Sequence, residues 1–252
     1  MRKIVFICSA IVLFAASAYA QKEKPWTDWT DKDVQKMLTD SAWAQTQKEL
    51  SDASGPSGPT ITSAAQNGNS ANMVMSDKDK SSSESGETMG RKNQTLTVNY
   101  SVSFLSAKPV RQAFIRFIEM KNPDTPKEKV EERRKFIDGD FSQYIVVSLR
   151  LDGNDRKKIG PALQLLTSSK PEDLKSTTYL ERKDGKRVEM IDYRAPGPDG
   201  MGAKFVFPRM VEGKPFLDGN SGEIRVYIEV GKTKLTRRFK VADMMYDGKL
   251  EY

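Results

Sequence analysis

The chain has 252 residues, a net charge of +7 at neutral pH, no histidine and a single cysteine, Cys8. These counts exclude a Ser–His–Asp triad, a histidine general base and a zinc site of the Cys/His type. The remaining catalytic chemistry would depend on carboxylates, lysine, serine or tyrosine, and the length suits one or two domains.

Residues 1–20 have the organisation of a secretory signal peptide. Arg2 and Lys3 precede an uncharged apolar run, and Ala18-Tyr19-Ala20 supplies the small residues that signal peptidase requires. We expect cleavage before Gln21, which leaves a mature chain without cysteine and so without disulfides. No later stretch has the roughly 20 apolar residues that span a bilayer. The sequence predicts an exported protein, periplasmic or secreted, with no transmembrane helix in the mature chain.

Residues 21–50 form an N-terminal segment in which a short helix is expected. Thr30 and Asp33 have the spacing of a capping box, with Thr30 at the N-cap. All tryptophans of the chain lie here: Trp26, Trp29 and Trp43. Large aromatic side chains are usually buried, which favours a role in anchoring this segment on the C-terminal domain. The alternative is an exposed surface that recognises a partner or a membrane.

Residues 51–94 have the composition of a disordered linker. The segment is rich in Gly, Ser, Pro and Asn, as in Ser54–Pro59, and nearly lacks large apolar side chains. Such a segment buries too little apolar area to offset the entropy lost on ordering. Two arrangements remain open: a tether between two units, or a long insertion between two strands of one domain.

Residues 95–252 have the periodicities of a folded domain. Strict alternation over Leu96–Phe104 predicts a half-buried strand, and apolar residues at helical spacing over Val110–Ile118 predict a helix. Thr125 has the position of an N-cap for a second helix that would end at Gly139. Tyr144–Leu151 is the next expected strand.

The second half of this domain is dominated by signals for antiparallel hairpins. Val146 lies opposite the apolar face of its strand and indicates partial cover there. Leu163–Leu166 predicts one or two helical turns. Asp184-Gly185 and Gly231-Lys232 predict turns between paired strands. With about seven strands, we predict an α+β domain, mainly an antiparallel β-sheet or sandwich with two or three helices.

Both ends of the mature chain resemble one family of exported bacterial proteins. The N-terminal segment has the pattern W-T-D-W…D-V-x-K-M-L-x-D-S-x-W-A, which begins at Trp26, and the C-terminus ends in Y-D-G-K-L-E-Y, which begins at Tyr246. The family has no assigned activity. The resemblance implies that both ends belong to one folded unit, and it implies no catalytic residue.

The motifs of several enzyme classes are absent from the sequence. The chain contains no Ser-x-x-Lys, no Gly-x-Ser-x-Gly and no Gly-rich phosphate loop. Asp152-Gly153-Asn154-Asp155 has the alternating oxygens of a calcium loop, but Arg156 occupies the position of the next ligand, so a polar turn is favoured. We therefore predict no catalytic residue, no metal site and no cofactor.

The penultimate strand carries a basic face, formed by Lys234, Arg238 and Lys240. Such a face can bind an anionic lipid surface, or it can be a solvated strand face that protects a sheet edge from aggregation. We expect no nucleic-acid partner, because aromatic side chains do not interleave with the basic ones and the compartment is wrong.

The leading functional hypothesis is an exported, non-enzymatic module that binds a cell-envelope component, which could be a protein, a glycan or an anionic lipid surface. Its candidate contact residues are Trp26, Trp29, Trp43, Lys234, Arg238 and Lys240. The alternative is a carboxylate-dependent envelope glycan hydrolase, which needs two close carboxylates in a pocket. A third hypothesis is a subunit that pairs a sheet edge with a partner strand.

Overall fold

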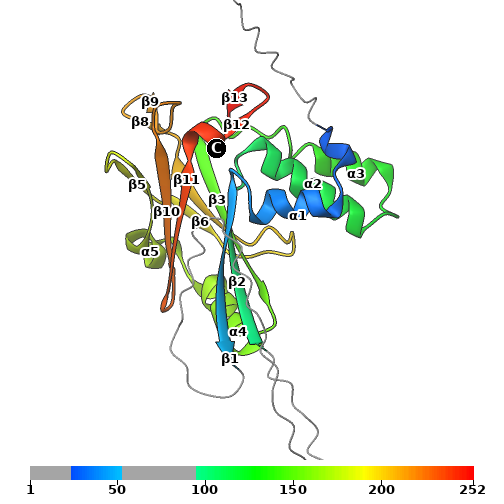
Figure 1. Cartoon of the computed structure of the whole chain (residues 1–252), viewed down its shortest axis with the longest axis horizontal. Helices are drawn as coiled ribbons and strands as arrows, with labels where there is room; N and C mark the ends of the chain where they lie inside the picture. Colours follow the sequence, from blue (N-terminus) through cyan, green and yellow to red (C-terminus); the bar gives the residue numbers. More distant parts are fainter. Residues whose placement is uncertain (1–23, 53–94) are drawn as a thin grey trace, which may run out of the picture.

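The computed structural model describes residues 24–52 and 95–252 (Figure 1). The predicted signal peptide and nearly all of the predicted linker lie outside the described residues. Over the described ranges the chain has an α+β fold with antiparallel sheets, as the sequence predicts. In the same ranges, no helix combines the length and the apolarity that crossing a bilayer requires.

Two main sheets organise the fold. The five-stranded sheet has the order β1 (Ala44–Asp52), β2 (Thr95–Phe104), β3 (Tyr144–Gly153), β7 (Ala203–Pro208), β6 (Asp192–Arg194). The four-stranded sheet has the order β11 (Thr233–Lys240), β10 (Glu223–Val230), β4 (Thr178–Arg182), β5 (Arg187–Glu189). Two short ladders join β8 (Met210–Val211) to β9 (Lys214–Pro215) and β12 (Met245–Tyr246) to β13 (Lys249–Leu250). The α-helices are α1 (Asp31–Thr39), α2 (Lys108–Lys121), α3 (Lys127–Arg134), α4 (Arg156–Ser168) and α5 (Pro171–Leu174).

The two sheets pack their apolar faces against each other. Alternation along β2 and β11 points Phe104 and Phe239 into the same core, where their rings meet edge to face at 5.0 Å. At one side of this core the edge strands β1 and β11 are joined by side chains. Gln45 donates to the main-chain oxygen of Arg238 at 2.5 Å, and Arg237 donates to the side chain of Gln47 at 2.6 Å. These side-chain contacts hold the two edge strands next to each other.

A helical layer covers the outer face of β1, β2 and β3 (Figure 1). The predicted capping box is present at α1: the Thr30 hydroxyl accepts from the Asp33 amide at 3.3 Å, and the Asp33 carboxylate accepts from the Thr30 amide at 2.9 Å. Arg150 of β3 extends into this layer, where it donates to the main-chain oxygen of Leu38 at 3.2 Å and lies 5.1 Å from the ring centre of Phe114. These contacts tie α1 and α2 to the sheet.

The strand β1 was not predicted from the sequence. Its residues, AQTQKELSD, have little β-propensity, but they pair with β2 from Ala44–Ser103 to Asp52–Thr95. Strand propensity depends strongly on the neighbouring strand, which explains why a polar segment is a strand here. Residues 53–94 thus connect two neighbouring strands of one sheet.

Two predicted helix boundaries were wrong. The helix expected from Thr125 to Gly139 is only Lys127–Arg134, with Pro126 at its N-cap. The short turn expected at Leu163–Leu166 belongs to α4, which is 13 residues long. It begins at Arg156, after the N-cap Asp155, whose side chain accepts from the amide of Lys158 at 3.2 Å. This capping contact sets the start of α4 well before the apolar residues on which the prediction depended.

Candidate functional site

The structure places the predicted tryptophan cluster mainly in the interior. Trp29 and Trp43 are buried, so the hypothesis that they form an exposed binding surface is wrong. Trp26 is half-buried, and the guanidinium of Arg134 lies 5.3 Å from its ring centre. Trp29 also accepts, through its main-chain oxygen, a hydrogen bond of 3.0 Å from Arg116 of α2. These contacts favour the anchoring interpretation.

Trp43 joins the two ends of the described chain. Its indole N–H donates to the main-chain oxygen of Glu251 at 2.8 Å, and its ring meets Tyr246 edge to face at 6.1 Å. The carboxylate of Glu251 in turn accepts from the amide of Lys108 at the start of α2. The N-terminal and C-terminal segments that carry the two patterns therefore lie in contact.

The predicted basic face on β11 is exposed. Lys234, Arg238 and Lys240 point away from the core, while Arg237 points inward to Gln47. Lys234 lies 3.5 Å from the carboxylate of Glu229, and Arg238 lies 3.7 Å from that of Glu223. The face is thus partly neutralised by acidic side chains of β10.

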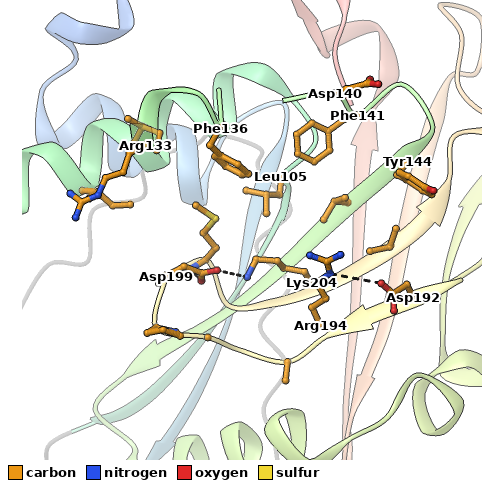
Figure 2. A pocket seen from close by; sticks show the side chains of 18 of the residues that line it. Leu105, Arg133, Phe136, Asp140, Phe141, Tyr144, Asp192, Arg194, Asp199 and Lys204 are labelled. Atoms are coloured by element: carbon orange, nitrogen blue, oxygen red, sulfur yellow. Dashed lines mark hydrogen bonds and ion pairs between the residues drawn. The ribbon is translucent and has the colours of Figure 1, made fainter. Parts of the chain in front are cut away.

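One hollow that the described residues form was not predicted. The helices cover β1 to β3 but stop short of β6 and β7, and the uncovered half of the sheet is the floor of a hollow of about 1160 Å³. We call it the uncovered-sheet pocket. Its walls are α2, residues 133–141 and residues 195–201, and Figure 2 shows its lining side chains.

Apolar side chains form much of this pocket. They come from every wall: Leu105, Ile115, Ile118, Phe136, Phe141, Val146, Ile191, Met201 and Val206. Ile191 and Tyr144 are notable because they are large and about half exposed, at 53% and 48%. Large side chains left open beside an apolar floor are typical of a binding surface.

Buried and half-buried side chains hold the walls of the uncovered-sheet pocket in place. Arg111 is buried, its guanidinium lies 4.5 Å from the Phe141 ring centre, and burial lowers its pKa. Arg209 donates to the main-chain oxygen of Phe141 at 2.9 Å. Below the floor, Tyr193 of β6 donates to the main-chain oxygen of Leu166 at 2.5 Å, and burial raises its pKa to about 12. These contacts fix the positions of the residues that form the walls and floor of the pocket.

Gly202 sets the path of the wall that carries Asp199. Its φ of +78° lies in the region that side chains disfavour, and a Cβ atom there would lie 2.2 Å from the main-chain oxygen of Leu149. Only glycine permits this close approach between the 195–202 segment and β3.

The carboxylates of the uncovered-sheet pocket are each engaged locally. Asp199 accepts from Lys204 at 2.7 Å, and Asp192 lies 3.8 Å from Arg194. Asp140 accepts from the amide of Ser142 at 2.8 Å. Figure 2 shows the three on different sides of the hollow. In the described ranges no three acidic side chains are grouped so as to hold a metal ion.

The pKa shifts in this pocket are downward. Burial raises the pKa of Asp199, but hydrogen bonds from Lys204 and the Met201 amide outweigh it and leave the pKa below its ordinary value. Hydrogen bonds from the amide and the side chain of Ser142 lower the pKa of Asp140. A glycosidase acid needs a raised pKa, so these two carboxylates suit that role poorly.

The predicted calcium-like stretch is a polar turn. Asp152 accepts from the side chain of Asn99 and Asn154 accepts from the amide of Thr97, both at 2.6 Å, while Asp155 caps α4.

Comparison of the chain with known protein families, curated proteins and solved structures finds no match.

Proposed function

We propose that this protein is an exported, non-enzymatic module that binds a cell-envelope component in the uncovered-sheet pocket. The observation that supports it best is that two large side chains, Tyr144 and Ile191, are about half exposed in a pocket of about 1160 Å³ with an apolar floor. A ligand that binds in such a pocket removes its apolar surface from water, which favours binding by about 25 cal/mol per Å² of apolar area buried.

The chemistry of the lining favours holding a ligand over hydrolysing one. Paired-carboxylate catalysis needs one acid with a raised pKa beside a second carboxylate. Here Asp199 and Asp140 have lowered pKa values, and Asp199 and Asp192 are each paired with a cation of their own. The glycan hydrolase therefore remains the weaker alternative.

The same lining describes the ligand in chemical terms. The floor needs an apolar group, such as an acyl chain or a cluster of apolar side chains. Arg133 and Arg194 at the rim can donate to polar groups of the same ligand, since guanidinium groups bind carboxylates and phosphates well. The ligand we propose is thus amphipathic.

The proposal is tested by retrieving the tagged protein from its native envelope after crosslinking and identifying bound species by mass spectrometry. Ile191→Asp places a charge on the apolar floor and should remove the bound species. Its matched control is Leu165→Asp, because Leu165 is also a partly exposed apolar residue, at 39%, but lies on α4 outside this pocket.

Two results would contradict the proposal. One is equal recovery of the same species with Ile191→Asp and with Leu165→Asp. The other is hydrolysis of envelope glycan by the purified protein, with the activity lost when Asp140, Asp192 or Asp199 is replaced by Asn. That result would favour the hydrolase instead.

A further inference from the structure

A second hollow lies on the opposite side of the molecule, on the outer face of the four-stranded sheet. It has a volume of about 550 Å³ and is formed where the turn between β4 and β5 meets the start of β10 and the end of β11. Its charged side chains are Glu181, Arg182, Lys183, Glu223, Arg225, Arg238 and Lys240. We call it the basic hollow.

The basic hollow has three more positive than negative side chains, and its cations differ in how they are paired. Arg182 donates to the main-chain oxygen of Phe216 and lies 3.0 Å from Asp184, and Arg225 donates to Glu181 at 2.9 Å. By contrast, Lys183 and Lys240 are exposed and have no ion-pair partner within the described residues.

The strand register brings two arginines face to face in the basic hollow. Arg225 of β10 is directly opposite Arg238 of β11. Like charges in directly opposed positions destabilise a strand pair. Each of the two arginines has one carboxylate nearby: Glu181 lies 2.9 Å from Arg225 but is shared with Arg187 at 2.6 Å, and Glu223 lies 3.7 Å from Arg238. The repulsion is therefore only partly offset within the chain.

Farther along the strands of the same sheet face, two outward cations are paired. Lys234 lies 3.5 Å from Glu229, and the guanidinium of Arg187 lies 3.7 Å from the ring centre of Tyr179 as well as beside Glu181. Lys232, in the turn between β10 and β11, is also exposed and has no ion pair within the described residues, so the positive charge is most concentrated, rather than found only, at the end of the sheet where the surface is concave. This coincidence separates the basic hollow from an ordinary solvated strand face.

We infer that the basic hollow is an anion site for a phosphate group. Arg238 and Arg225 would donate from opposed guanidinium groups, and Lys183 and Lys240 would supply point charges at its rim. Arginine suits this ligand because its planar fork matches phosphate oxygens, and charge-assisted hydrogen bonds of this type are strong. The site does not depend on the uncovered-sheet pocket, so either can fail alone.

The test uses the mature full chain and two probes. Inorganic pyrophosphate represents a free phosphate, and vesicles of phosphatidylcholine with phosphatidic acid represent a phosphate headgroup on a surface. The double variant Arg238→Gln/Lys240→Gln should weaken binding of the recognised probe at least tenfold. The matched control Lys232→Gln/Lys234→Gln removes the same charge from the turn before β11 and from the start of that strand, and should change binding less than twofold.

The same variants give a second measurement that does not depend on a titration. Pyrophosphate should raise the melting temperature of the wild type and of the control, because a ligand that binds only the folded state stabilises it. It should not raise the melting temperature of the Arg238→Gln/Lys240→Gln variant. Binding of pyrophosphate with these differences identifies a free phosphate as sufficient, and binding of the acidic vesicles alone identifies a headgroup. Equal weakening in both double variants, or binding of neither probe, would overturn the inference.

Discussion

The two sheets of this protein expose very different outer faces. The outer face of the five-stranded sheet is half covered by α1 and α2, and its open half is an apolar pocket whose aspartates are paired locally. The outer face of the four-stranded sheet is charged. Tyr179 and Tyr227 stack at 4.8 Å near its middle, and Lys183 and Lys240 at one end have no ion pair with any residue that the structure describes.

The difference shows what strand alternation does and does not determine. In both sheets it decides which side chains point outward, but the type of these side chains decides whether a helix, a ligand or water covers them. The outward residues of β2 and β3 include small ones such as Ser103 and Ser148, which hydrogen-bond to each other at 2.9 Å beneath the helical layer. Those of β10 and β11 are long and charged.

The largest expected effect concerns the covered half of the five-stranded sheet. Trp43→Ala would remove a buried ring together with its hydrogen bond to Glu251. We expect a loss of about 3–5 kcal/mol in the free energy of unfolding, measured with urea. Trp26→Ala, at a half-buried position, is the control and should cost clearly less. Equal losses would show that the covered half does not depend on this anchor.

A smaller effect is expected at the boundary between the covered and uncovered halves. Gly202→Ala would strain the backbone and also force the 195–202 segment away from Leu149, which we expect to cost about 2–3 kcal/mol. Gly200 also has a positive φ, of +73°, but a Cβ there meets nothing within 4 Å.

Gly200→Ala is therefore the matched control for this position and should cost about 1 kcal/mol, from the backbone conformation alone. Urea unfolding of both variants measures the difference. If they lose the same free energy, the close approach of Gly202 to β3 is not important for the wall.

The smallest effect is the pH dependence of the Asp199–Lys204 pair. The pKa of Asp199 is lower in the folded protein than its ordinary value of 3.8, so its contribution to stability is present above about pH 4 and is lost as the pH falls through the folded value. Asp199→Asn should lower the free energy of unfolding at pH 6 by less than about 1 kcal/mol, because the carboxylate is partly exposed.

The same measurement at acidic pH checks the sign. The difference between the wild type and Asp199→Asn should disappear as Asp199 becomes protonated in both states. A difference that persists at pH 2 would mean that the asparagine disturbs the 195–202 segment by another route.

Local signals in the sequence were sufficient for part of the fold. The capping box at Thr30, the alternation of β2 and the hairpin of β10 and β11 were confirmed, because each depends on neighbouring residues. Strand β1 was missed, because its polar residues become a strand only by pairing with β2 across 42 intervening residues. The N-cap of α3 was misassigned to Thr125, because the actual N-cap is Pro126, which has no side-chain hydrogen bond to mark it.

The candidate sites could be predicted only in part. The alternation of β11 predicts that Arg238 and Lys240 are exposed. It does not predict that Arg225 and Lys183 lie beside them, because Arg225 is placed there by the pairing of β10 with β11 and Lys183 by the turn after β4. The uncovered-sheet pocket is lined by residues of α2, β3, β6 and β7, which are far apart in the sequence, so no single segment predicts it. One local sign was present. Val188 and Met190 are apolar and buried at alternate positions, so a polar residue is expected at the next position, but that position is Ile191, an exposed apolar side chain.

The central claim is that an envelope ligand occupies the uncovered-sheet pocket, and site-specific photocrosslinking in the native envelope tests it most directly. A photoreactive aromatic residue would replace Tyr144 at the rim or, as the control, Met245, which is equally exposed at 48% but lies outside the pocket. We predict one discrete crosslinked species at position 144 that is absent at 245 and is lost when Ile191→Asp is added. No crosslink at 144, or the same products at both positions, would contradict the account.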